Sequence, residues 1–328
     1  MINLFGKSRI LNLFLFPLIV LVIWCSKLYH PMEVDTDNAF PLYYELLKII
    51  SFNTYGMLLL AMSLVLVQSY LFNNIVYRYD LLPESNDYTG VIYLLLMSCF
   101  PDQLSIHPVL LANFFLLIAI KRFFQVVDDG IFKNIKIYDI GLMIGIASLF
   151  YYPMLFTLPA FVISLISWHK YHWRYWVVLT MGVLTPILLW VIYLFFQDTL
   201  SISTFITTSV APFLKYQIIK LPSFTDKAFI LWLGLILLAS LVQFFITRNS
   251  FLKAKTRLAL TFFLLLLLLM GIGYSFAEKN SLVGFSFLAI PITLMVANFL
   301  TTIDRPFVIE LVGLGIFIFI LINQYSTI

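Results

Sequence analysis

The residues best suited to chemistry lie together in the first polar break of the sequence, after an apolar opening. Glu33, Asp35 and Asp37 occupy alternate positions, and His30 precedes them. Carboxylates beside a histidine can serve as a general base, and carboxylates can also hold a Mg²⁺ or Mn²⁺ ion. We therefore take Asp35 and Asp37 as candidate catalytic residues and His30 and Glu33 as candidate substrate ligands. The sequence leaves open whether a metal ion takes part.

Three further polar segments supply candidate substrate-binding residues. Asp102 and His107 flank a proline-containing turn, and Lys215, Lys220 and Lys279 lie in later polar segments. Lysine side chains at a membrane surface can hold a lipid phosphate. Each of these residues also fits an ordinary loop that is polar because it meets water. A functional site requires that all of them face the same side of a membrane.

The composition predicts an integral membrane protein. Apolar residues make up 62% of the 328 positions and charged residues 11%, whereas a soluble domain has about 45–50% and about 25%. Residues 260–270 belong to apolar stretches that reach the roughly 20 residues a helix needs to cross the hydrocarbon layer. Helices are expected rather than barrel strands, because barrel strands alternate apolar and polar residues.

We predict an all-α, polytopic membrane protein of about 11 transmembrane helices that forms a single domain over residues 1–328. Prolines and polar turns separate the predicted helices from one another. The helices are expected at 10–27, 43–72, 89–101, 108–124, 136–150, 153–168, 176–197, 227–247, 257–277, 282–300 and 307–325.

The distribution of basic residues predicts the orientation. With the N-terminus in the cytoplasm and the C-terminus outside, 14 of the 20 lysines and arginines are cytoplasmic, in agreement with the positive-inside rule. Residues 28–53 then form an outer loop followed by an interfacial helix, in which Glu45 and Lys48 make a favourable pair. Residues 198–226 form the longest outer loop. All the candidate site residues therefore face the outside.

Charge and motifs exclude several functional classes. The net charge of +4 is spread over many short loops, which is typical of membrane topology and not of nucleic-acid binding. The sequence has no GxxxxGK[ST], GxGxxG, HExxH, GxSxG or paired CxxC motif. It therefore gives no support to an ATPase, a dehydrogenase, a zinc protease or a serine hydrolase. The expected partners are the lipid bilayer and other membrane proteins.

The layout of about the first 125 residues resembles the GT-C class of polytopic membrane glycosyltransferases. In that class a first span leads to an outer loop with a catalytic acid, then to an interfacial helix and the second span. The matching segments here are residues 10–27, 33–37, 43–53 and 55–72. The pair of short spans with Pro101, Asp102, His107 and Pro108 between them is also similar to that class.

The resemblance implies a role for each group of residues. Asp35 or Asp37 would be the catalytic base or the metal ligand, and the donor would be a polyprenyl-phosphate sugar. The phosphate of the donor would lie near Lys215, Lys220 or Lys279. The chain is also similar to bacterial inner-membrane proteins of this size, which implies a multi-pass location in the inner (cytoplasmic) membrane.

Two other functions fit the same sequence. One is a non-catalytic scaffold subunit of a cell-envelope assembly, in which the outer acids would tolerate substitution. The other is a transporter or lipid flippase, for which Glu310 is the suspect residue. Glu310 is the acid that we place inside an apolar span, where a carboxylate is costly and by default functional. Its position about one turn from Arg305 also fits a place near the headgroups.

Overall fold

The described part of the chain is helical throughout. The computed structural model describes residues 9–29, 41–49, 53–83, 88–129, 134–168, 173–197, 224–247, 254–275, 282–302 and 306–325, and these contain no strand. The α-helices are α1 (Arg9–Tyr29), α2 (Pro41–Ile49), α3 (Thr54–Arg78), α4 (Tyr88–Leu96), α5 (Pro108–Asp129), α6 (Asn134–Phe150), α7 (Leu158–Ser167), α8 (Trp173–Phe196), α11 (Phe224–Thr247), α12 (Ala254–Ser275), α13 (Ala289–Thr302) and α14 (Pro306–Tyr325). Short 3₁₀ segments are η2 (Pro101–Gln103), η3 (Tyr152–Thr157) and η5 (Leu282–Leu288).

The helix lengths confirm the all-α membrane class. Among the described residues, six helices are long and apolar enough to cross a membrane. They are Thr54–Arg78, Pro108–Asp128, Trp173–Phe196, Asp226–Phe245, Ala254–Ser275 and Val283–Thr302, and shorter apolar helices occupy Phe14–Tyr29, Tyr152–Ser167 and Val312–Gln324. The total of eleven crossings and the orientation remain predictions.

Four of the expected helices differ from those in the structure, and two of them, 153–168 and 282–300, begin with the 3₁₀ segments η3 and η5. The range 43–72 is divided into α2 and α3, and Asn53 caps α3 by accepting a hydrogen bond from the Thr54 amide at 2.8 Å. The range 89–101 is helical only to Leu96, so α4 has nine residues. A helix of that length spans about 13.5 Å, which is too short to cross a bilayer on its own. The expected break at Tyr151 and Pro153 is present, because η3 separates α6 from α7.

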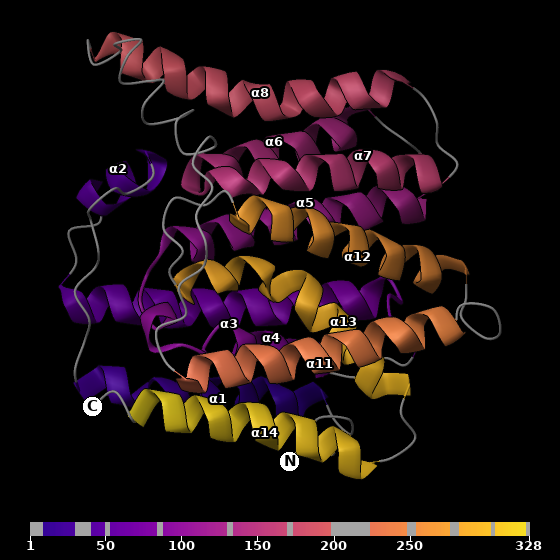
Figure 1. Cartoon of the computed structure of the whole chain (residues 1–328). Helices are drawn as coiled ribbons and strands as arrows, with labels where there is room; N and C mark the ends of the chain where they lie inside the picture. The colour runs from indigo at the N-terminus through magenta and orange to yellow at the C-terminus, as the bar shows by residue number, and fades with distance from the viewer. Residues whose placement is uncertain are drawn as a thin grey trace.

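The helices lie side by side with roughly parallel axes (Figure 1). α8 forms one edge of the bundle and packs on α6, which packs on α5; α1 and α14 pair at the opposite edge. We call the end of the bundle that carries α2, Tyr29 and Thr54 the α2 end. The opposite end is tied by an ion pair between Lys255 and Asp128 and by a hydrogen bond from Thr256 to the Asp80 carbonyl.

Glycines let α6 and α8 approach each other closely. A Cβ atom on Gly141 would overlap the Leu179 carbonyl oxygen, and one on Gly182 would overlap the Tyr138 carbonyl oxygen. Gly145, one turn after Gly141, is covered in the same way by α8. Small residues spaced four apart allow two backbones to meet inside a membrane, where the hydrophobic effect does not drive helix association. The glycines therefore hold α8 in place on the bundle.

We expect Gly141→Ala to weaken the packing of α8 on α6. The added methyl group meets backbone atoms that have no room to move, so the free energy of unfolding should fall by about 1–3 kcal/mol. Thermal unfolding of the purified protein in detergent measures the change. Gly234→Ala and Gly271→Ala are matched controls, because a Cβ at either position meets no atom within 4 Å. Equal melting of Gly141→Ala and the controls would contradict close glycine packing.

Candidate functional site

The connection between α4 and α5, residues 97–107, is the largest irregular segment enclosed by the described helices. Nine of its eleven residues are buried, including Phe100 and Leu104, while Ser105 is half-buried and Asp102 is exposed. Backbone outside a helix is tolerated in an apolar bundle only where protein or water satisfies its polar groups. The partners of this α4–α5 connection therefore show which helices build the site.

Side chains from three distant helices supply those partners. The Trp24 indole on α1 donates to the Ser98 hydroxyl at 3.1 Å, and the Gln324 amide on α14 donates to the Ser98 carbonyl at 3.1 Å. The Tyr43 hydroxyl on α2 donates to the Ile106 carbonyl at 2.9 Å. All three donor side chains are buried. The short helix α2 is thus fastened to the bundle by the α4–α5 connection itself.

A buried polar network lies directly below this connection. The Gln68 amide on α3 donates to the Leu110 carbonyl at 2.8 Å and accepts from the Tyr93 hydroxyl of α4 at 2.6 Å. Gln68 lies about 21 Å along α3 from Thr54, at 1.5 Å per residue. The beginning of α5 therefore sits opposite the middle of α3, and the α4–α5 connection reaches deep into the bundle.

Asn113 on α5 extends the network to η5. Its side chain is hydrogen-bonded to Tyr93 and donates to the Ser286 carbonyl at 2.8 Å. Within the described ranges, the Asn113 Oδ1 and the Ser286 hydroxyl have no hydrogen-bond partner although both are buried. Orphaned polar atoms of this kind are rare in folded proteins. The network thus leaves unused hydrogen-bonding capacity in the interior.

The two predicted site residues that the structure describes have different roles. Asp102 is exposed, and its carboxylate acts electrostatically on the ammonium group of Lys27 at the end of α1. His107 is buried and caps α5, because its Nδ1 and its carbonyl oxygen both accept from the Leu110 amide. His107 ends the irregular segment and starts α5, so its observed role is structural. Contact of either residue with a substrate remains a prediction.

A hydrogen bond fixes the tautomer of the buried His107 ring. Since Nδ1 accepts a hydrogen bond, the proton lies on Nε2. In the described part of the chain this Nε2 has no partner. A neutral donor remains available at the edge of the α4–α5 connection.

The other predicted site residues lie outside the described residues. They are Asp35 and Asp37, the candidate catalytic acids, and the candidate ligands His30, Glu33, Lys215, Lys220 and Lys279. Their roles remain predictions. The backbone of Glu310 belongs to α14, but its side chain is outside the described set. The described residues contain no group of three histidine, cysteine or acidic side chains that could hold a metal ion.

Asp226 is a buried carboxylate. The sequence placed it only at the end of the predicted outer loop, residues 198–226. It lies in the first turn of α11 with 4% of its surface exposed, and its Oδ1 accepts from the Asn323 amide at 3.1 Å. Gln324, next to Asn323, is the residue that binds the Ser98 carbonyl. The available sequence signal was an acid at the start of an apolar helix, where a negative charge complements the helix dipole. The burial of Asp226 depends on α14 and was not predictable from neighbouring residues in the sequence.

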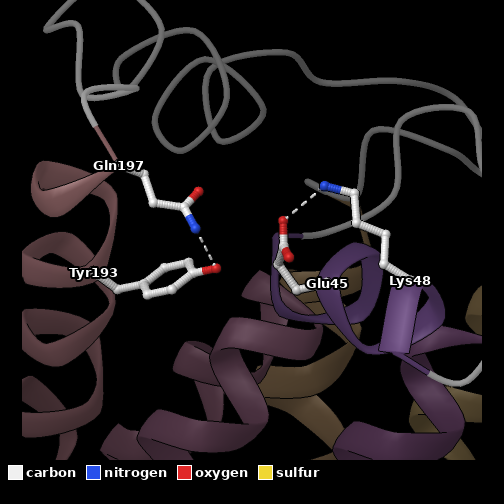
Figure 2. Close-up of polar contacts among 4 residues, drawn as sticks. All are labelled: Glu45, Lys48, Tyr193 and Gln197. Atoms are coloured by element: carbon white, nitrogen blue, oxygen red, sulfur yellow. Dashed lines mark hydrogen bonds and ion pairs between the residues drawn. The ribbon is translucent and has the colours of Figure 1, made fainter.

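Polar side chains also lie on α2 and on the end of α8 that faces it. Glu45 and Lys48 form the expected ion pair at 3.1 Å, and the Lys48 ammonium lies 4.3 Å from the centre of the Tyr44 ring. On α8, the Gln197 amide donates to the Tyr193 hydroxyl at 2.6 Å. Figure 2 shows the α8 pair facing the α2 pair. The hydrogen bond to Glu45 raises the pKa of Lys48, so the lysine is charged at neutral pH.

Comparisons with protein-family models, with curated proteins and with solved structures find no match for this chain.

We expect Tyr93→Phe to destabilise the protein by about 1–2 kcal/mol. The change removes the hydroxyl that satisfies Gln68 Oε1 and leaves a buried acceptor unpaired. Thermal unfolding in detergent measures the loss. Tyr55→Phe on α3 is the control, because the Tyr55 side chain is 48% exposed. If both variants melt at the temperature of the unmodified protein, the network does not contribute to stability.

Proposed function

We propose that the protein is a membrane glycosyltransferase that transfers a sugar from a polyprenyl-phosphate donor. The observation that carries the proposal is the order and attachment of the first elements. α1 ends at Tyr29, the acidic segment follows, and α2 is a separate short helix fastened by Tyr43 to the α4–α5 connection before α3 begins. This is the arrangement of the GT-C class that the first 125 residues resemble.

The anchored ends of the acidic segment support the placement of the catalytic residues. Tyr29 and Pro41 flank Asp35 and Asp37, and both flanking residues belong to helices at the α2 end. The same end carries Asp102 with Lys27 and the buried Asp226. In the proposed orientation this end faces the outside of a bacterial inner membrane, where polyprenyl-linked sugars would be used.

The proposed reaction needs few protein groups. Asp35 or Asp37 accepts the proton of an acceptor hydroxyl, whose oxygen forms a bond to the anomeric carbon of the sugar. The bond from that carbon to the phosphate oxygen breaks, and the polyprenyl phosphate leaves as an anion. Lys215, Lys220 or Lys279 would stabilise the charge on the leaving phosphate. If the carboxylates hold a Mg²⁺ or Mn²⁺ ion, the ion would also stabilise the negative charge on the leaving phosphate.

We expect the double variant Asp35→Asn, Asp37→Asn to abolish sugar transfer without unfolding the protein. Asparagine keeps the shape of aspartate but cannot act as a base at neutral pH. Mass spectrometry of the envelope glycoconjugates of cells that carry only the variant measures the loss. Asp80→Asn is the control, because Asp80 is exposed at the opposite end and its φ of 49° suits asparagine equally.

The outcome also separates the alternative functions. A glycoconjugate profile that the double variant leaves unchanged rules out catalysis by these acids. Co-purification of a fixed membrane partner would then favour the scaffold subunit, and loss of lipid or solute flux on replacement of Glu310 by glutamine in vesicles would favour the transporter or flippase.

A further inference from the structure

The adjoining ends of α2 and α8 bear polar side chains on two helices whose other exposed side chains are mainly apolar. Figure 2 shows the Tyr193 hydroxyl and the Gln197 amide directed toward the side of α2, where Glu45 and Lys48 lie. We name these four side chains the α2–α8 site.

Both halves of the α2–α8 site are held by rigid packing. α2 is anchored by the buried Tyr43, which bonds the Ile106 carbonyl, and α2 also contacts α6. α8 is held on α6 by the glycine contacts of Gly141 and Gly182. The four polar side chains therefore stand on two helices that share α6 as their support. A site on supported helices is better preorganised than one on loops.

Among the described residues, several hydrogen-bonding groups of the α2–α8 site have no partner. Lys48 has three N–H donors, of which one contacts Glu45 at 3.1 Å. The Tyr193 hydroxyl accepts from Gln197 and keeps its own proton to donate. Glu45 keeps its second carboxylate oxygen, and Gln197 keeps its carbonyl oxygen as acceptors. Donors suited to a phosphate thus lie beside acceptors suited to hydroxyl groups.

The location is the boundary between hydrocarbon and water. Gln197 is the first polar residue after the apolar run at the end of α8, where Phe195 is 66% and Phe196 80% exposed. The Trp190 and Tyr193 rings lie nearby in a tilted arrangement with centres 5.2 Å apart, and such aromatic residues favour the headgroup level. Because α8 lies at the edge of the bundle (Figure 1), we expect bilayer lipids next to this helix.

We infer that the α2–α8 site binds the headgroup of an anionic glycerophospholipid that joins a phosphate to free hydroxyls. Lys48 and the Tyr193 hydroxyl contact the phosphate oxygens, while a headgroup hydroxyl donates to Glu45. The choice of a phospholipid follows from Glu45, because its carboxylate repels a doubly charged bare phosphate more than a singly charged phosphodiester. The same carboxylate accepts a hydrogen bond from a headgroup hydroxyl. The inference does not rest on the proposed glycosyltransferase activity.

The first test measures phosphate recognition by Lys48. Native mass spectrometry of the purified protein titrated with phosphatidylglycerol should show about fivefold weaker binding for Lys48→Gln, which corresponds to one lysine at a membrane surface. Lys227→Gln is the matched control, since Lys227 is an exposed lysine near the start of α11 at the α2 end. Equal loss in the two variants would show diffuse attraction and overturn the inference.

The second test measures hydroxyl recognition by Glu45. Phosphatidylethanol has the same phosphate charge as phosphatidylglycerol and lacks free hydroxyls. The unmodified protein should bind phosphatidylglycerol about threefold more tightly, as a charge-assisted hydrogen bond allows. Glu45→Ala should erase this preference. A preference that persists in Glu45→Ala, or none in the unmodified protein, contradicts the assignment of the headgroup.

A third probe, undecaprenyl phosphate, separates this inference from the proposed function. Tighter binding of undecaprenyl phosphate than of phosphatidylglycerol, lost in Lys48→Gln, would overturn the phospholipid assignment and give the site to a polyprenyl donor. Phosphatidylglycerol binding that the double variant Asp35→Asn, Asp37→Asn leaves unchanged supports the inference, whatever the effect of that variant on sugar transfer.

Discussion

The structure depends on satisfying the backbone of one irregular segment inside an apolar bundle. The α4–α5 connection exposes carbonyl groups that no helix of its own can pair, and an unpaired polar group in such surroundings costs several kcal/mol. Trp24, Tyr43 and Gln324 meet this requirement around Ser98 and Ile106. These donors come from the beginning and the end of the sequence. The conformation of the connection therefore depends on the packing of α1, α2 and α14 around it.

Different interactions stabilise the two ends of the bundle. At the opposite end, Lys255 and Asp128 form an ion pair that is partly exposed, and exposed pairs contribute about 0–1 kcal/mol. At the α2 end the contacts are buried hydrogen bonds in apolar surroundings, where losing one partner leaves the other unsatisfied. The α2 end is thus the better scaffold for positioning side chains with precision. The candidate catalytic segment begins and ends there, which is consistent with its proposed role.

The sequence predicted those parts of the fold that depend on local pattern. Apolar stretches, proline breaks and the spacing of Glu45 and Lys48 were sufficient for the all-α membrane class and the ion pair on α2. The length of α4 was not predictable in this way, because residues 97–100 are as apolar as the helix before them. Their departure from the helix is fixed by partners on α1 and α14, which lie far away in the sequence.

The same reasoning explains the outcome for the candidate site. His107 and Asp102 could be found as polar residues beside prolines, but their difference in burial arises from the surrounding helices. Asp226 shows the converse case. A buried carboxylate is costly unless it is hydrogen-bonded, and Asp226 accepts a hydrogen bond from Asn323 of the last described helix. In the sequence alone, Asp226 is recognisable only as a residue between a polar loop and an apolar helix.

Asp226 also changes what the GT-C resemblance implies. The resemblance covers about the first 125 residues, yet the α4–α5 connection within that region is completed by Gln324, whose neighbour Asn323 binds Asp226. The start of α11 and the end of α14 are therefore structural parts of the α2 end. A segment limited to the first five helices would leave the Ser98 carbonyl without its donor from α14. The described helices that flank the acidic segment are therefore supported by residues far beyond the first 125.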